Sequence, residues 1–120
     1  MKKVWVVEDD PSIREIISIL LLEEGYDVRL FENASKFVVA INTSKDHVDV
    51  IVMDIRLPDG NGVNLCHKVK TSENFSQVPV LMMSADATFG DVERFCRADD
   101  YIPKPFDIRE MVRKVARLSA

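Results

Sequence analysis

The sequence has no long hydrophobic run, few cysteines and no excess of basic charge, and each absence excludes a class of protein. None of its apolar stretches approaches the roughly 20 residues of a membrane-spanning helix. Its first residues lead into a short apolar strand instead of a signal peptide. The net charge of −4 argues against direct nucleic-acid binding, which usually requires a basic face. We therefore expect a cytoplasmic protein that contacts neither membrane nor nucleic acid.

The cysteines and histidines show no pattern of a reactive site. Cys66 and Cys96 are too few for a disulfide framework and lack the spacing of metal ligands. Both lie among apolar residues on expected helices, so we interpret them as buried structural thiols. His47 and His67 have no nucleophile or ligand partner nearby in the sequence, and we treat them as structural or surface residues.

Short apolar strands alternate with amphipathic helices along the whole chain. The expected strands cover residues 4–7, 28–31, 49–53, 78–83 and 100–102. The apolar faces of the helices after them are Ile13, Ile16, Ile17, Leu20 and Leu21; Ala34, Phe37, Val38 and Ile41; Leu65, Cys66 and Val69; Phe89, Val92, Phe95 and Cys96; and Ile108, Met111, Val112 and Val115. This alternation predicts one α/β domain over residues 1–120, with a parallel sheet and helices on both faces.

Local signals mark where several of these elements begin and end. Asp10 with Pro11 after it, Asn33 and Asp107 are typical helix N-caps, and Gly25 is a typical helix stop. Residues 57–62 contain the proline, asparagine and glycines of a tight turn. Residues 74–77 are expected to form a polar loop.

Polar side chains follow four of the five strands. Glu8 and Asp9 follow the first, Asp54 the third, Ser84 the fourth and Lys104 the fifth. A flavodoxin-like, doubly wound sheet of strand order 2-1-3-4-5 brings these strand ends to one crevice. The alternative is that Asp54 merely caps the following turn and the others are scattered end-of-strand residues.

The convergence predicts a particular chemistry. Crowded carboxylates repel one another unless a cation offsets them, and Mg²⁺ suits such an oxygen-rich site. Lys104 and the Ser84 hydroxyl can hold the oxygens of a phosphoryl group while a carboxylate attacks it. Asp54 is the best candidate nucleophile, because it is the lone acid on the central strand.

The same residues resemble the receiver domain of two-component response regulators, over essentially all 120 residues. The matching motifs are Val6-Val7-Glu8-Asp9-Asp10, Asp54-Ile55-Arg56-Leu57-Pro58 with Gly62, Ser84-Ala85, and Asp99-Asp100-Tyr101-Ile102-Pro103-Lys104-Pro105-Phe106. The stretches VWVVEDDPSIR, FEN and KPFDI are most similar to receivers of the nitrogen-regulatory type.

The resemblance implies a phosphorylation-controlled signalling module, not an enzyme acting on external substrates. Asp54 would accept a phosphoryl group from a phosphohistidine of a sensor histidine kinase or histidine phosphotransfer protein. Asp9 would bind Mg²⁺ directly and Glu8 directly or through water. Asp54 and the backbone carbonyl of Arg56 would complete the protein ligands.

The resemblance also implies how the phosphoryl group is sensed. Lys104 would contact it, and the Lys104–Pro105 peptide bond is expected to be cis. Ser84 and Tyr101 match the family's switch pair, in which the hydroxyl approaches the phosphoryl group and the aromatic ring turns inward. The switch would change the surface around the fourth helix, fifth strand and fifth helix, which a downstream effector or an output domain would read.

Three features depart from the family pattern. Ser84 stands where threonine is commoner, although the hydroxyl donor is kept. The segment from Ser84 to Tyr101 is about two residues shorter than is typical, which predicts a reshaped fourth helix. Arg97 replaces the usual glycine and predicts a different helix exit or local strain.

Two other functions and some open points remain at this stage. A phosphohydrolase working through an aspartyl phosphate would carry a second acid where Arg56 stands, which counts against it. A pseudo-receiver would lack some of the reactive residues, and this chain keeps them. A stand-alone receiver, a piece of a longer regulator and a homodimer are all compatible with the sequence.

Overall fold

A parallel five-stranded sheet forms the centre of the computed structural model, which describes residues 1–85 and 96–120. Its strands are β1 (Lys3–Val7), β2 (Asp27–Phe31), β3 (Val50–Asp54), β6 (Val80–Ser84) and β7 (Asp100–Pro103). They lie in the order β2-β1-β3-β6-β7 and every neighbouring pair is parallel. This confirms the predicted flavodoxin-like order, in which the sheet reverses direction between β1 and β3.

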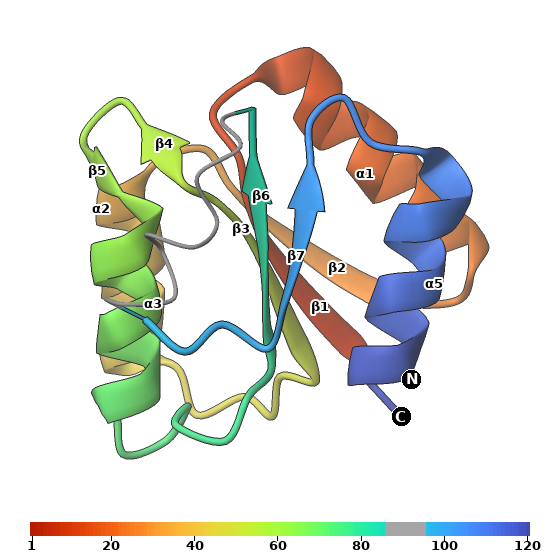
Figure 1. The fold of residues 1–120 in the computed structure, drawn as a ribbon. Helices are drawn as coiled ribbons and strands as arrows, with labels where there is room; N and C mark the ends of the chain where they lie inside the picture. The colour runs from red at the N-terminus through yellow and green to blue at the C-terminus, as the bar shows by residue number, and fades with distance from the viewer. Residues whose placement is uncertain (86–95) are drawn as a thin grey trace.

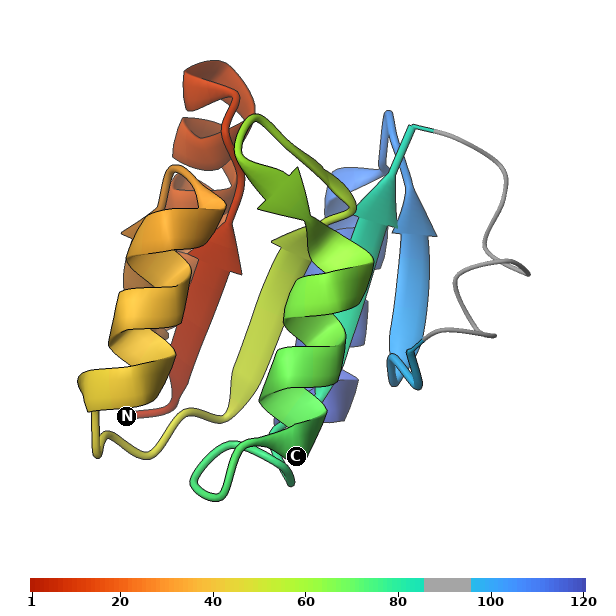
Figure 2. The same ribbon diagram turned by 90° about the vertical axis from the view of Figure 1, so that its left-hand side faces the viewer.

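Helices cover both faces of the sheet. The described helices are α1 (Pro11–Glu23), α2 (Ala34–Thr43), α3 (Gly62–Thr71) and α5 (Ile108–Leu118). Figures 1 and 2 show α2 and α3 on one face, with α1 and α5 on the other. The expected helix with Phe89, Val92 and Phe95 falls outside the described residues. None of the described helices has the length and apolar character to cross a bilayer.

The predicted start and stop signals act as expected. The carboxylates of Asp10 and Asp107 and the amide oxygen of Asn33 accept backbone N–H groups at the first turns of α1, α5 and α2. Gly25 follows α1 with a φ of 88°, a conformation that glycine adopts at little cost. Asn61 caps α3 in the same way, which the sequence analysis did not identify.

Each face of the sheet buries its own apolar cluster. Alternation along β3 sends Val50 and Val52 to one face, and Ile51 and Met53 to the other. The cluster beneath α2 and α3, here called the α2–α3 cluster, includes Trp5, Phe37, Ile51, Met53, Leu65, Cys66, Val69, Phe75 and Cys96. Because β3 is covered on both sides, the strand that ends in Asp54 is held rigidly.

Three side chains lie differently from the prediction. Ile16 and Ile108 belong to predicted apolar stripes but are 47% and 52% exposed. The contact surfaces of α1 and α5 are narrower than those stripes, and Ile17 and Met111 fill them. Phe75 lies in the loop predicted to be polar, yet it is buried with its ring centroid 5.3 Å from that of Trp5.

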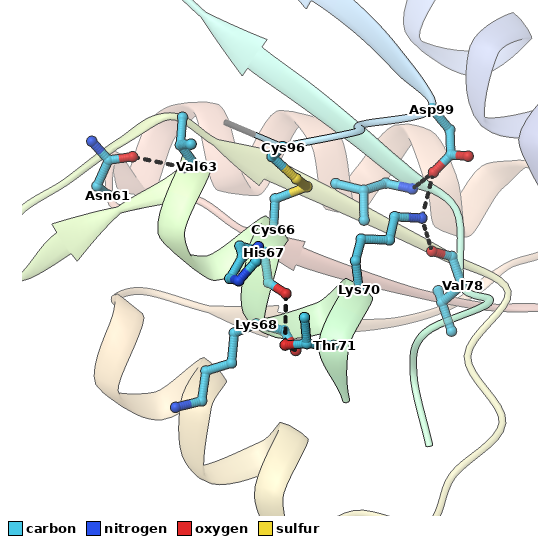
Figure 3. The surroundings of a disulfide bond; sticks show 11 residues. Asn61, Val63, Cys66, His67, Lys68, Lys70, Thr71, Val78, Cys96 and Asp99 are labelled. Atoms are coloured by element: carbon cyan, nitrogen blue, oxygen red, sulfur yellow. Dashed lines mark hydrogen bonds and ion pairs between the residues drawn. A yellow bond between two sulfur atoms is a disulfide. The ribbon is translucent and has the colours of Figure 1, made fainter. Parts of the chain in front are cut away.

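The cysteines are joined in a disulfide, so their interpretation as free thiols is wrong. Cys66 on α3 is bonded to Cys96, with 6.1 Å between their Cα atoms (Figure 3). Cys96 lies in the irregular chain before β7, not on a helix as predicted. A separation of 30 residues gave no sequence signal of the pairing, because only the fold brings α3 against this chain.

The disulfide should contribute measurably to stability. It closes a loop with a sequence separation of 30, and restricting the unfolded chain in this way stabilises the folded state by about 3.6 kcal/mol. Reduction of the wild type should lower the free energy of unfolding by that amount in urea titrations. The double variant Cys66→Ala/Cys96→Ala should show no response to reductant. An equal response in both proteins would contradict the assignment of the effect to this bond.

Candidate functional site

The turn after β1 carries two acids in different environments. Glu8 is fully buried, whereas Asp9 is exposed. The Glu8 N–H donates to the carbonyl of Phe31 at the end of β2, at 3.1 Å. The Arg14 guanidinium donates to the carbonyls of Glu8 and Asp9, at 2.9 and 3.2 Å. Arg14 thus stabilises this turn. Nothing in the sequence around Arg14 predicted this role.

Asp54 ends β3 at the carboxyl edge of the sheet, between the ends of β1 and β6. Its side chain is buried, and one carboxylate oxygen accepts the N–H of Arg56 at 3.2 Å. The next residue, Ile55, donates its N–H to the carbonyl of Met83 at 3.0 Å, so the chain stays attached to the sheet past Asp54. The carboxylate is therefore held in place.

A small hairpin follows Asp54 and is attached to the start of α2. Strands β4 (Arg56–Leu57) and β5 (Gly60–Asn61) pair around the predicted turn, near the edge where β6 and β7 end in Figure 1. Asp59 in this turn accepts the N–H groups of Ala34 and Ser35 at the start of α2. The bond from Ala34 is the main cause that holds the pKa of Asp59 below its ordinary value.

Gly62 brings the start of α3 directly against the backbone of Asp54. Its N–H donates to the carbonyl of Ile55 at 2.7 Å. A Cβ at this position would lie 2.2 Å from the carbonyl oxygen of Asp54 and 2.8 Å from the Cα of Ile55. Only glycine allows this approach.

Lys104 enters the site from β7. Its N–H donates to the carbonyl of Ser84 at 2.8 Å, and the Lys104–Pro105 peptide bond is cis. Its ammonium donates to Asp54 Oδ2 at 2.7 Å and also to the carboxylate of Glu8. One cation thus joins the acids that follow β1 and β3.

Burial and close contact shift the pKa values of Glu8 and Lys104. Burial and the neighbouring Asp54 raise the pKa of Glu8 from 4.5 to about 7, against the lowering effect of Lys104. Burial alone would lower the pKa of Lys104, but its hydrogen bonds to Asp54 and Glu8 outweigh burial and raise it. The lysine stays charged, whereas Glu8 is only partly ionised near neutrality.

The acids form a group that fits a divalent cation. Glu8, Asp9 and Asp54 each offer a carboxylate oxygen, and these atoms lie within 4.8 Å of one another. A set of oxygen donors with unbalanced negative charge suits a hard cation that keeps some of its waters. The site could therefore hold a metal ion.

The sequence singles out four further residues: Ser84, Tyr101, Arg56 and Arg97. Ser84 is buried at the end of β6, beside the strand of Asp54. Tyr101 lies on β7 opposite Met82 and packs, half-buried, against the α2–α3 cluster. Arg56 is held beside Asp54 by its N–H, and its carbonyl as a metal ligand stays a prediction. Arg97 is exposed, and Gly25 alone among the described residues has a positive φ, so no left-handed strain occurs at Arg97.

Fold and site together define a class: a doubly wound α/β protein with a carboxylate cluster and a lysine at the carboxyl edge of its sheet. The family model of the response regulator receiver domain matches residues 4–116. The chain belongs to the response regulator receiver family, whose members are signalling modules of two-component systems.

Individual relatives agree with this assignment. The chain is 38% identical over 118 residues to the DNA-binding transcriptional regulator NtrC of Proteus hauseri, covering 95% of this chain and 24% of that protein. It is 34% identical over 121 residues to the regulator RpaA of Synechocystis, covering 98% and 49%. The chain thus spans a quarter to a half of these curated relatives.

A solved receiver domain has the same overall fold. The receiver domain of a sensor histidine kinase from Pseudomonas aeruginosa, with magnesium coordinated in its active-site cleft, is 30% identical. The TM-score is 0.87, and the match covers 98% of this chain and 97% of that one.

Replacing Gly62 with alanine should damage both stability and the site. The added Cβ would force α3 away from the backbone of Asp54, at a cost of about 2 kcal/mol. Urea unfolding and Mg²⁺ titration should show a lower free energy of unfolding and weaker metal binding. Asn64→Ala, an exposed change on the same helix, is the matched control. If Gly62→Ala keeps the wild-type free energy of unfolding and Mg²⁺ affinity, the close approach of Gly62 to the backbone of Asp54 is contradicted.

The raised pKa of Glu8 should make the metal-free protein less stable as pH rises. Between its unfolded value of 4.5 and its folded value of about 7, the folded state binds more protons, so stability falls with pH over this range. Glu8→Gln removes the penalty and should raise the free energy of unfolding at pH 8 by about 3 kcal/mol, with little change at pH 4.

Urea titrations across this pH range measure the difference. Glu15→Gln, which changes an exposed acid on α1, should keep the wild-type pH dependence. A parallel pH dependence of stability in wild type and Glu8→Gln would exclude Glu8 as its source.

Proposed function

We propose that this chain is switched by phosphorylation of Asp54, and that the donor is a phosphohistidine on a sensor histidine kinase or histidine phosphotransfer protein. The observation that carries the proposal is the Lys104 ammonium bonded to Asp54 inside a cluster of three carboxylates. Such an arrangement places a fixed nucleophile beside a fixed positive charge, which phosphoryl transfer requires.

The transfer uses the carboxylate of Asp54 as the attacking group. One of its oxygens forms a bond to phosphorus while the P–N bond to the donor histidine breaks, and the imidazole nitrogen takes the bonding electrons and a proton. Lys104 lies 2.7 Å from Asp54 Oδ2 and would follow the negative charge onto the phosphoryl oxygens. Later attack by water releases inorganic phosphate and restores the carboxylate.

Magnesium is the cation we assign to the acidic cluster. Glu8, Asp9 and Asp54, with the carbonyl of Arg56, would hold Mg²⁺, which supplies positive charge against the phosphoryl oxygens. The three carboxylates support this assignment, because their oxygens lie within 4.8 Å of one another and the single ammonium of Lys104 cannot balance all of them. Bound Mg²⁺ would keep Glu8 ionised.

The phosphorylated state would be read on the neighbouring surface. Ser84 would turn its hydroxyl toward the phosphoryl group, and the half-buried ring of Tyr101 would turn further inward against the α2–α3 cluster. The surface of β7, α5 and the chain that follows Ser84 would then present a changed face to a downstream effector or an output domain.

The setting of the protein follows from the same proposal. The relative NtrC is a DNA-binding regulator. In a protein of that kind, DNA binding would belong to an output domain and not to this acidic chain. The chain would act in the cytoplasm, where its kinase partner presents the phosphohistidine.

Intact mass after incubation with acetyl phosphate tests the acceptor. Wild type should gain one phosphoryl group only when Mg²⁺ is present, and Asp54→Asn should gain none. Asp27→Asn is the control, because Asp27 is an exposed acid at the start of β2, away from the carboxyl edge. Equal phosphorylation of Asp54→Asn would contradict the assignment. So would failure of the wild type to bind beryllofluoride with Mg²⁺, since this complex mimics the phosphoryl group.

A further inference from the structure

We propose that Cys66 and Cys96 are a redox-modification site. Oxidation of the pair by a small-molecule disulfide such as oxidised glutathione would favour the conformation that the protein adopts when Asp54 is phosphorylated. The inference rests on the proposed phosphorylation of Asp54. It goes beyond it by adding a second input to the same switch.

A structural role alone does not account for the bond. A chain of 120 residues that buries clusters on both faces of its sheet has enough core to fold without a covalent staple. Disulfides of cytoplasmic proteins are usually transient and serve catalysis or redox sensing. In a signalling domain, we therefore interpret this disulfide as a redox sensor.

The disulfide is connected to the acceptor through α3. Gly62 fixes the first residue of this helix against the carbonyl of Asp54, and Cys66 lies about one turn further along. Any shift of Cys66 is therefore made by a helix whose first residue is packed against Asp54. The disulfide links the same helix to Cys96.

A second attachment holds the chain that follows Cys96. Lys70, about one turn after Cys66, donates to the Asp99 carboxylate at 2.8 Å and to the carbonyl of Val78 at 3.0 Å (Figure 3). The same Asp99 oxygen accepts the N–H of Val80 at 2.8 Å. Reduction would free Cys96 from α3, while the Lys70–Asp99 pair still holds the start of β7.

The disulfide and the proposed switch residue share one apolar cluster, although the retained Asp99 attachment lies between them in the chain. Cys96 and Cys66 belong to the α2–α3 cluster, and Ala98 and Tyr101 pack against it. The closed disulfide therefore accompanies a Tyr101 ring that packs on this cluster, toward which phosphorylation would turn it further. Oxidation should favour that state, and reduction should lower its population.

The exchange starts at Cys96, the more exposed of the two cysteine residues. Cys96 is 5% exposed and Cys66 is 0% exposed. The Cys96 thiolate attacks a sulfur of oxidised glutathione and releases one glutathione thiolate. The Cys66 thiolate then attacks the Cys96 sulfur of this mixed disulfide and releases the second. The protein loses two electrons and two protons, and oxidised glutathione becomes two thiols.

Beryllofluoride titration with excess Mg²⁺, on the full 120-residue chain, tests the coupling. The oxidised protein should bind about fivefold more tightly than the protein reduced with dithiothreitol. The double variant Cys66→Ala/Cys96→Ala should bind like the reduced protein, with no response to reductant. Glutathione buffers give the reciprocal measurement, since beryllofluoride should stabilise the disulfide by the same factor.

The outcomes separate this inference from the proposed function. Binding in both states with equal affinity, or tighter binding by the reduced protein, would overturn the redox inference and leave phosphorylation intact. If neither the oxidised nor the reduced protein binds beryllofluoride, the proposed function itself is overturned. If the double variant does not fold, the reciprocal glutathione titration of the wild type decides alone.

Discussion

The ammonium of Lys104, shared between Asp54 and Glu8, is the interaction on which the rest of the site depends. Two buried carboxylates face each other at the sheet edge, and the lysine is the only described cation bonded to both. Its position is fixed by the backbone bond to Ser84, which ties β7 to the end of β6. Without that cation, the acids would be driven to protonate. With it, burial and the neighbouring Asp54 still raise the pKa of Glu8 to about 7.

The topology explains how residues so far apart in sequence meet. Parallel strands end at one edge, and the reversal of strand order between β1 and β3 leaves a crevice where the first acids and Asp54 converge. Burial of β3 on both faces and the close approach of Gly62 hold Asp54. The same approach places the first residue of α3 against the backbone of the acceptor.

Much of this could be predicted from the sequence, because strand ends, caps and the order of polar residues are local signals. The unbroken apolar run before Asp54 and the cap at Asp10 are read directly from the chain. The contacts that the sequence analysis missed depend on tertiary packing. Cys66 and Cys96 meet only after α3 docks, and Phe75 is buried because its short loop folds back onto Trp5. The missed cap role of Asp59 likewise requires the hairpin to lie against α2.

A crystal structure with Mg²⁺ and beryllofluoride tests the central claim most directly. The account predicts beryllofluoride on a carboxylate oxygen of Asp54, with the metal ion held by the acids that follow β1 and β3. It also predicts that Lys104 leaves Glu8 for a fluorine atom, since the cation follows the charge. Beryllofluoride bound elsewhere, or Lys104 still joined to both carboxylates, would contradict the account.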